Sequence, residues 1–195
     1  MLGKRKFTDS EMKTLLKSMT VIIDTRENVN QHITNYLTKA KVPFKKQKLD
    51  AGDYSIFLPA NKDLNIPVDI YYTDEIAFER KNSLEEISSN LTTGRQQFES
   101  ELLRNKCEFF TLLIEGGSYD KILSEDYKTQ YDKKSFLATL AAFKMRYKIH
   151  IEFISKEEIA GHMCRQFYYF LREKLKEGAM SHEPATMPLP NLPES

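Results

Sequence analysis

Two short stretches of the sequence place charged side chains next to apolar strands. Gly52-Asp53-Tyr54 opens one predicted strand, and Ile76-Ala77-Phe78 leads directly into the triplet Glu79-Arg80-Lys81. Buried strands rarely end in charges unless these neutralise one another or bind something. Carboxylates from two segments, here Asp53 and Glu79, would hold a hard divalent cation through their oxygens. The pattern predicts metal-assisted phosphodiester hydrolysis; the other interpretation is an exposed strand end with a fortuitous salt bridge.

Lys81 is the third residue of this prediction. It lies two positions after Glu79, and because side chains alternate along a strand, both point to the same face. Its ammonium would orient the attacking water or neutralise developing charge. The cation would polarise the scissile phosphate and lower the pKa of a bound water. We therefore expect Mg²⁺ or Mn²⁺ and no small-molecule cofactor.

Further motifs surround these two stretches. Val21-Ile22-Ile23 ends in Asp24-Thr25-Arg26-Glu27, Gly94-Arg95 follows the triplet, and residues 111–114 end in Glu115-Gly116-Gly117. The series resembles the nuclease domain of the XPF-type structure-specific endonucleases, whose signature is Asp-x-Arg-Glu, Gly-Asp-Tyr and Glu-Arg-Lys-x-x-x-Asp. By motif the resemblance covers about residues 20–117, and by element order it reaches about residue 177.

The resemblance implies an α/β fold of the restriction-endonuclease-like type, PD-(D/E)XK, with a mixed central sheet flanked by helices. It also implies Mg²⁺-dependent cutting of DNA near flaps, forks or four-way junctions in repair, recombination or replication. Carried over residue by residue, it makes Asp53, Glu79 and the backbone carbonyl of Arg80 the metal ligands, and Lys81 the catalytic lysine. The Arg80 side chain would be a phosphate clamp or an ion-pair partner. The further residues that it implies at the catalytic site are Asp24, Glu27 and Glu85.

The chain departs from the family's pattern at two points. Glu85 stands where the signature has Asp, and 25 residues lie between Asp53 and Glu79, of which 59–72 form a predicted inserted loop or hairpin. These two departures affect the expected substrate preference more than they affect the expected reaction chemistry. Glu85 and Glu86 also follow Ser83 at a predicted helix start, where a capping box and the helix dipole favour acidic residues. Glu115 would either join the site or pair with a nearby Lys or Arg.

The net charge is only +1, so DNA contacts can be predicted only from local clusters of positively charged residues. The lysine-rich stretch at residues 39–48 is either a solvated face or an electrostatic footprint for phosphates. Arg95, at a predicted helix start, has the same two interpretations. The residues expected to contact DNA are Arg26, Arg95, Lys45, Lys46 and Lys48.

The histidines and cysteines give no evidence for a metal site or a disulfide framework. His162 and Cys164 lie on different sides of a predicted helix, which argues against a zinc site. For His32 and His150 the sequence identifies no partner. The two cysteines give no disulfide framework.

Composition is that of a soluble enzyme domain. The 195 residues are 41% hydrophobic and 29% charged. No run approaches the roughly 18 apolar residues of a membrane span, and the basic start lacks the apolar core of a secretory signal. We expect an intracellular protein, in the cytoplasm or nucleoid, or in the nucleus of a eukaryote, with no membrane partner. The expected organisation is an extension with a short helix at 1–19, a nuclease domain at 20–177 and a disordered proline-rich tail at 178–195.

Hydrophobic periodicity predicts helices at about residues 8–18, 30–41, 84–91, 95–106, 135–147 and 156–177. Strands are expected at about residues 20–24, 44–49, 54–58, 76–80, 109–115 and 149–154. The last helix carries more large apolar side chains than one buried face requires, which predicts a homodimer or heterodimer through the C-terminal helical region. The tandem helix-hairpin-helix module that usually accompanies the family's nuclease domain is not expected.

Two functional classes follow. The first is an active endonuclease on branched DNA, and the second is a catalytically inactive, junction-binding partner subunit. Inactive partners in this family usually lose the acidic ligands, so the presence of Asp24, Asp53 and Glu79 favours the enzyme. A sequence-specific restriction enzyme on the same fold is a third alternative.

Overall fold

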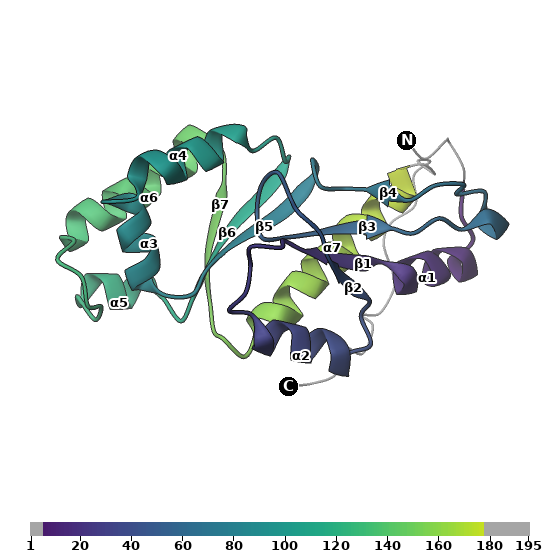
Figure 1. Ribbon diagram of the computed structural model, residues 1–195, viewed down its shortest axis with the longest axis horizontal. Coiled ribbons are helices and arrows are strands. Elements are labelled where there is room, and N and C mark those ends of the chain that lie inside the picture. Colours follow the sequence, from purple (N-terminus) through teal and green to yellow (C-terminus); the bar gives the residue numbers. More distant parts are fainter. Residues whose placement is uncertain (1–5, 178–195) are drawn as a thin grey trace.

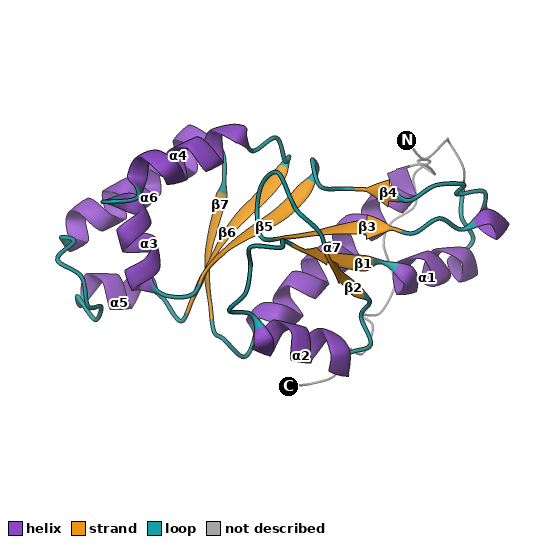
Figure 2. Cartoon of the chain, viewed as in Figure 1, coloured by secondary structure: helices purple, strands orange, loops and turns teal. Residues whose placement is uncertain are grey.

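The structure is a computed structural model that describes residues 6–177. Within these residues, helices lie on both faces of one sheet, as Figure 2 shows. The helices are α1 (Asp9–Ser18), α2 (Gln31–Lys39), the short 3-10 helix η1 (Lys62–Leu64), α3 (Leu84–Leu91), α4 (Arg95–Arg104), α5 (Tyr119–Leu123), α6 (Lys133–Tyr147) and α7 (Ile159–Glu177). The strands are β1 (Thr20–Ile23), β2 (Phe44–Lys46), β3 (Tyr54–Leu58), β4 (Ile70–Tyr71), β5 (Ile76–Lys81), β6 (Phe109–Glu115) and β7 (His150–Ile154).

The sheet is mixed, with the order β2-β1-β3-β5-β6-β7 and with β4 paired to β3. Strand β3 runs antiparallel to both β1 and β5, while β5, β6 and β7 are parallel to one another. Parallel neighbours need crossover connections, and α3 to α6 provide them between β5, β6 and β7. This arrangement confirms the predicted α/β class with a mixed central sheet flanked by helices.

The two faces of the sheet are covered differently. On one face, α1, α2 and α7 pack against β1, β3 and β5 through residues such as Ile23, Ile56 and Phe78. On the other face, α3, α4 and α6 cover the half formed by β5, β6 and β7 (Figure 1). On this second face Ile22 and Phe57 of β1 and β3 form a small cluster with Leu49 from the β2–β3 loop. The strand end that carries Glu79 and Lys81 therefore lies between a helix-covered half and a loop-covered half of the sheet.

Local sequence signals account for several element boundaries. Helix α1 begins with the predicted capping box, in which the Thr8 hydroxyl accepts the Glu11 N–H at 3.3 Å and the Glu11 carboxylate accepts the Thr8 N–H at 2.8 Å. Leu15 and Leu16 of this helix are buried in the core shared with α7. The N-terminal helix is therefore packed into the same core as the sheet.

Other boundaries differ from the expectations. The strand predicted at 44–49 ends at Lys46, and the last helix begins at Ile159 instead of residue 156. Helix α5, five residues long, was not predicted because so short a segment carries no measurable period. The insertion at 59–72 forms a hairpin in which β4 pairs antiparallel with β3, one of the two forms expected.

Some expectations lie beyond these observations. The predicted disordered tail at 178–195 lies outside the described residues, and the domain boundaries stay a prediction. Among the residues that the structure describes, no helix is long and apolar enough to cross a membrane.

Candidate active site

A glycine turn brings Asp53 to the end of β5. Gly52 has a φ of 75°, and a Cβ at this position would meet the Ala77 Cβ and the Phe78 carbonyl oxygen, each at 3.0 Å. Only glycine allows this close approach of two backbones without strain. The Asp53 N–H then donates to the Phe78 carbonyl at 2.8 Å, and the Asp53 carbonyl accepts the Asp24 N–H at 2.8 Å. Asp53 is thus held by backbone bonds between the ends of β1 and β5.

Asp53, Glu79 and Lys81 form one cluster, here called the catalytic cluster. The Lys81 Nζ lies 2.7 Å from the Glu79 Oε1, and one Asp53 carboxylate oxygen accepts the Arg80 N–H at 2.8 Å. The side chains of Glu79 and Lys81 are only 14% and 10% exposed. All three line a cavity of about 220 Å³ whose opposite wall is α4. The structure therefore brings together the three residues that carried the prediction.

The charges of this cluster do not cancel. Burial, and then the negative charge of Glu79, raise the pKa of Asp53 well above its ordinary value. Burial also raises the pKa of Glu79, and Lys81 offsets only part of this effect. Burial disfavours the ammonium of Lys81, but its contact with Glu79 outweighs this and raises the lysine pKa. Asp53 and Glu79 share this one lysine, and the Glu86 carboxylate also lies 3.9 Å from its Nζ, so an additional cation would stabilise the site.

The donor set of the cluster fits a magnesium ion. Carboxylate oxygens are hard ligands, and Mg²⁺ in enzymes is typically held by one or two carboxylates, with waters and substrate phosphates completing its shell. Among the described residues, no group of three or more His, Cys, Asp or Glu side chains is placed to hold a metal. Asp53 and Glu79 would hold the ion, and the remaining positions would fall to water, to phosphate oxygen and to the Arg80 carbonyl.

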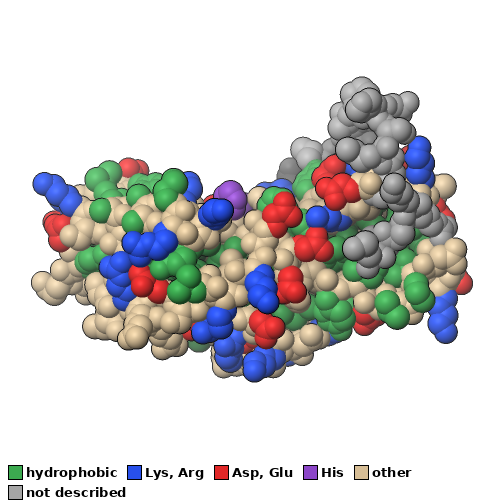
Figure 3. Space-filling view, turned by 90° about the horizontal axis from the view of Figure 1, so that it is seen from above, with side chains coloured by type: hydrophobic (Ala, Val, Ile, Leu, Met, Phe, Trp, Pro, Cys, Tyr) green, Lys and Arg blue, Asp and Glu red, His purple; other side chains and the backbone are tan. Residues whose placement is uncertain are grey.

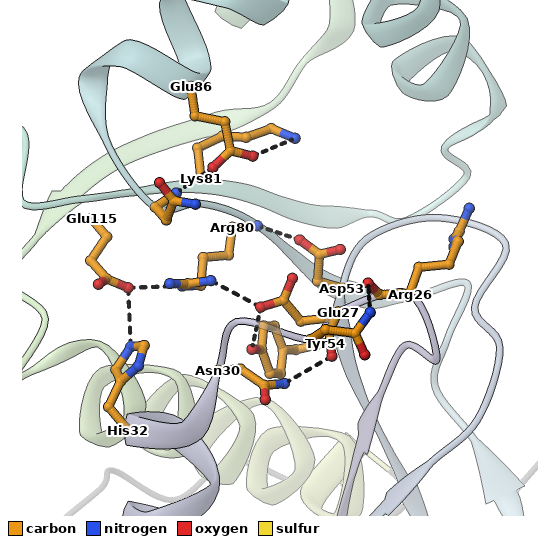
Figure 4. A network of polar contacts seen from close by, with 12 residues as sticks. Arg26, Glu27, Asn30, His32, Asp53, Tyr54, Arg80, Lys81, Glu86 and Glu115 are labelled. Carbon is orange, nitrogen blue, oxygen red and sulfur yellow. Dashed lines mark hydrogen bonds and ion pairs between the residues drawn. The ribbon is translucent and has the colours of Figure 1, made fainter.

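Arg80 points to the opposite face of β5, where it joins a buried ion network. Its guanidinium contacts the Glu115 carboxylate at 2.8 Å and the Glu27 carboxylate at 2.9 Å, and its side chain is 3% exposed. His32 of α2 lies 3.1 Å from the same Glu115 oxygen, as Figure 4 shows. The Tyr54 hydroxyl donates to Glu27 at 3.3 Å. We call Glu27, Arg80, Glu115 and His32 the ion network.

The ion network shows which of the predicted roles the Arg80 and Glu115 side chains have. The Arg80 side chain is an ion-pair partner and is too deeply buried to clamp a phosphate on the surface. Glu115 pairs with Arg80, as one of its two interpretations required. Glu27, expected at the edge of the catalytic site, forms an ion pair with Arg80, and its negative charge also contributes to the raised pKa of Asp53. His32, for which the sequence identified no partner, has one in Glu115.

Asp24 is fully enclosed and fully bonded. It is 0% exposed, and its carboxylate accepts the Arg26 Nε at 2.7 Å and the Leu49 N–H at 2.6 Å. Burial alone would raise the pKa of Asp24, but these hydrogen bonds and the Arg26 charge outweigh it and lower the pKa. Unlike Asp53, this aspartate has no unsatisfied charge. It fixes the β2–β3 loop and the base of Arg26 beside the cavity.

The two acidic residues at the start of α3 have structural partners. The Glu86 N–H donates to the Ser83 hydroxyl at 3.2 Å, and the Glu86 carboxylate accepts the Asn82 N–H at 2.9 Å, close to the expected capping box. The Glu85 carboxylate accepts the Lys128 N–H at 2.9 Å and so anchors the loop between α5 and α6. This hydrogen bond is also the main reason why the Glu85 pKa is lowered.

The residues predicted to contact DNA do not form one surface. Lys45 and Lys46 alternate along β2, and the Lys45 Nζ lies 3.8 Å from the Phe57 ring centroid on the loop-covered face. Arg95 pairs with Glu99 at 3.0 Å at the start of α4. Arg26 and Lys48 do come together in a groove beside the cavity, and Arg26 also lines the cavity itself.

Helix α4 contributes three polar residues that the sequence analysis missed. Gln97, Glu101 and Arg104 all line the cavity, and the Gln97 amide donates to Glu101 at 3.2 Å. Their spacing of four and three residues puts them on one side of a helix, beside the apolar face formed by Phe98 and Leu102. The helical spacing of these three residues is visible in the sequence. Only the packing of α4 over β5 shows that their side of the helix faces Asp53 and Glu79.

Comparisons with known proteins agree with this architecture. Residues 23–166 match the family model described as the ERCC4 domain. XPF from Aeropyrum pernix has a similar solved structure, with a TM-score of 0.57 and 20% identity over 81% of this chain and 69% of that chain. A structure of XPF from Aeropyrum pernix in complex with DNA has a TM-score of 0.55 and 19% identity, over 80% of this chain and 66% of that chain. A search of the curated proteins found no match.

The family match spans most of the sheet and its catalytic end, from the last residue of β1 into α7. The structural likeness, at this low identity, independently supports the restriction-endonuclease-like fold. Both agree with the order of the Gly-Asp-Tyr and Glu-Arg-Lys motifs along the sheet. The chain therefore belongs to the ERCC4 domain family, as an XPF-type nuclease domain.

Proposed function

We propose that this protein is a Mg²⁺-dependent endodeoxyribonuclease that cuts DNA near branches such as flaps, forks or four-way junctions. The observation that carries the proposal is the catalytic cluster, with two incompletely neutralised carboxylates beside a buried lysine. Family membership supports the reaction class, and the DNA complex of XPF from Aeropyrum pernix supports the substrate. The biological setting that we propose is DNA repair, recombination or replication.

Each residue of the cluster has a distinct task in this proposal. A bound magnesium ion would supply Lewis-acid activation of the scissile phosphate and of a water molecule. Asp53 is oriented by the Arg80 N–H, so its carboxylate is already fixed before substrate arrives. Lys81, 2.7 Å from Glu79, orients that carboxylate and adds a positive charge where the phosphorane develops negative charge. The cavity wall formed by α4 limits the access of bulk water.

The test is a cleavage assay with the purified protein on end-labelled flap, fork, four-way and linear duplex DNAs. We expect cutting near the branch with Mg²⁺ or Mn²⁺, none with Ca²⁺, and the same cut position whatever bases flank the junction. Asp53→Asn, which replaces a metal ligand by an isosteric amide, is the matched control. Tight junction binding without cleavage would instead support the inactive partner subunit, and cutting of linear duplex at a fixed motif would support a restriction enzyme.

Pairing with a second subunit belongs to the same proposal. The large side chains of α7 are mostly core, since Phe167, Leu171 and Leu175 are at most 1% exposed. What remains accessible is a groove of about 480 Å³ between α7 and the sheet, lined by Phe109, Tyr169 and Phe170 among others. We propose this groove as the dimer face. Light scattering should give about twice the chain mass of 22.8 kDa, whereas an active monomer at tens of micromolar would reject pairing.

A further inference from the structure

A second groove opens directly onto the catalytic cavity. It has a volume of about 500 Å³ and is formed by the β2–β3 loop, the β4–β5 turn and the segment that links α4 to β6. Both hollows share the lining residues Arg26, Asp50, Ala51 and Arg104, so they adjoin each other. A strand bound in the catalytic cavity can extend into the groove on this side.

The groove carries unneutralised positive charge. Its cationic residues are Lys48, Arg104, Lys106 and Arg26, the last already paired with Asp24, against the two carboxylates of Asp50 and Asp74. Within the described part of the chain, Lys48, Arg104 and Lys106 form no ion pair and no side-chain hydrogen bond. Elsewhere on the surface, some cations are paired, as Arg95 and Arg146 are with Glu99. Free cations that converge on one concave surface attract a polyanion.

Charge on the surrounding surface is mixed. Figure 3 shows Lys and Arg side chains interspersed with Asp and Glu side chains on the face seen from above, and the net charge of the chain is only +1. A polyanion is therefore not attracted by the molecule as a whole. It has to be guided by local groups, and the groove beside the catalytic cavity brings three such cations, Lys48, Arg104 and Lys106, together on one concave surface.

Hydrogen bonds, most of them partly buried, connect the segments that form the walls of the groove. The Arg26 guanidinium donates to the Leu49 carbonyl at 3.1 Å, and Asp24 binds both Arg26 and the Leu49 N–H. On the other wall, the Cys107 thiol donates to the Thr73 carbonyl at 3.1 Å and links the α4–β6 segment to the β4–β5 turn. A groove with fixed walls needs little ordering when a ligand binds.

We propose that this groove holds the phosphodiester backbone of the DNA strand on one side of the scissile phosphate. Arg104, which lines both hollows, would contact the phosphate nearest the cut, and Lys106 and Lys48 would contact phosphates further out. The inference rests on the proposed nuclease function and assigns the path by which its substrate reaches the metal ligands. It adds Arg104 and Lys106 to the DNA-contacting residues.

The test compares two charge-matched double variants. Arg104→Ala/Lys106→Ala removes two groove cations, whereas Lys13→Ala/Lys17→Ala removes two exposed cations from α1, which packs on the opposite face of the sheet. Binding of a labelled fork is followed by fluorescence anisotropy in Ca²⁺ across a NaCl series. Each lost phosphate contact should lower the slope of log K against log salt by roughly 0.7–0.9, so the groove variant should lose about 1.4–1.8 and the control none.

The outcomes separate the groove from the chemistry. An unchanged salt slope in the groove variant, with its fold verified by thermal unfolding, would overturn the proposed path. A wild-type protein that binds forks with the expected loss in the groove variant, but cuts nothing in Mg²⁺, would reject the endonuclease and leave the groove standing. If the double variant does not fold, Lys48→Ala and Lys106→Ala, each at an exposed position, provide the same measurement with a slope change of about 0.7–0.9.

Discussion

The two faces of strand β5 carry the same kinds of residue in opposite electrostatic conditions. Glu79 and Lys81 point toward α4 and share the cavity with Asp53, so the two carboxylates of this cluster have one ammonium between them; Glu101 and Arg104 of α4 also line the cavity. Arg80, between them in the sequence, points to the other face and is bonded on two sides by Glu27 and Glu115. The first group lines a cavity, and in the second group the guanidinium of Arg80 is 3% exposed and enclosed by its two carboxylate partners.

This difference separates function from stability within three consecutive residues. In the ion network both carboxylates contact the buried guanidinium of Arg80, which bonds each of them at 2.8–2.9 Å, and buried charges are tolerated when they are paired in this way. In the catalytic cluster the carboxylate pKa values are raised, because burial and mutual repulsion are not fully compensated. Shifted pKa values of this kind are typical of ligand-binding and catalytic sites. The comparison predicts that substitutions on the two faces have opposite consequences.

The largest effect is expected from Arg80→Met. Without the guanidinium, Glu27 and Glu115 stay buried beside each other without a counter-charge, so the free energy of unfolding should fall by about 3–5 kcal/mol. Urea denaturation followed by circular dichroism measures this loss. Arg80→Lys should lose less, because it keeps the charge but not the two-sided geometry. A loss below about 1 kcal/mol in Arg80→Met would show that solvent already compensates these carboxylates.

On the other face, Glu79→Gln should spare stability and abolish most of the activity. The amide keeps the shape but not the charge needed to hold a metal, so the single-turnover cleavage rate should fall by about a hundred-fold or more, at least ~2.7 kcal/mol of transition-state stabilisation. The free energy of unfolding should be unchanged or higher. Glu125→Gln, at a 55% exposed carboxylate remote from the cavity, is the control and should cut normally. Full activity in Glu79→Gln would reject the site assignment.

The catalytic cluster was predictable because it follows from patterns within a few residues of the sequence. Alternation along a strand puts Glu79 and Lys81 on one face, and a glycine before Asp53 signals a tight turn. The ion network was only partly predictable. His32 and Glu115 are 83 positions apart, and they meet because α2 packs at the end of β6. No spacing in the sequence encodes that contact.

The DNA-contacting residues show the same division. Lys45 and Lys46 were grouped by proximity in sequence, although β2 sends them to opposite faces of the sheet. Arg104 and Lys106 were overlooked because the sequence at the end of α4 is typical of an exposed helix end. Their convergence with Arg26 and Lys48 depends on three loops meeting at one edge of the sheet. The fold class and the proposed metal ligands are predicted from short-range patterns, whereas grooves depend on how distant segments pack.

Two aspartates at the edge of the cavity should give opposite pH dependence in metal-free buffer with EDTA. The Asp53 pKa is raised on folding, so its favourable contribution is present at low pH and is lost as pH rises through the folded pKa. The Asp24 pKa is lowered, so its contribution is present above the unfolded pKa and is lost as pH falls through the folded pKa. Unfolding free energies measured from about pH 3 to pH 8 should therefore fall less steeply toward high pH in Asp53→Asn, and less steeply toward low pH in Asp24→Asn. Identical profiles for both variants would mean that the two carboxylates experience the same environment.

The smallest effect is expected at Glu85, which stands where the family signature has Asp. Its carboxylate accepts the Lys128 N–H at 2.9 Å, and no contact joins it to Asp53 or Glu79 within the described residues. Glu85→Ala should therefore lower the free energy of unfolding by about 0.5–1.5 kcal/mol, the net worth of one such hydrogen bond. Glu85→Gln retains an acceptor oxygen and should lose less than half of that. Both variants should cut branched DNA within a few-fold of the wild type. A hundred-fold loss of cleavage in both variants, with stability retained in Glu85→Gln, would instead place the Glu85 charge in the reaction and extend the catalytic cluster into α3.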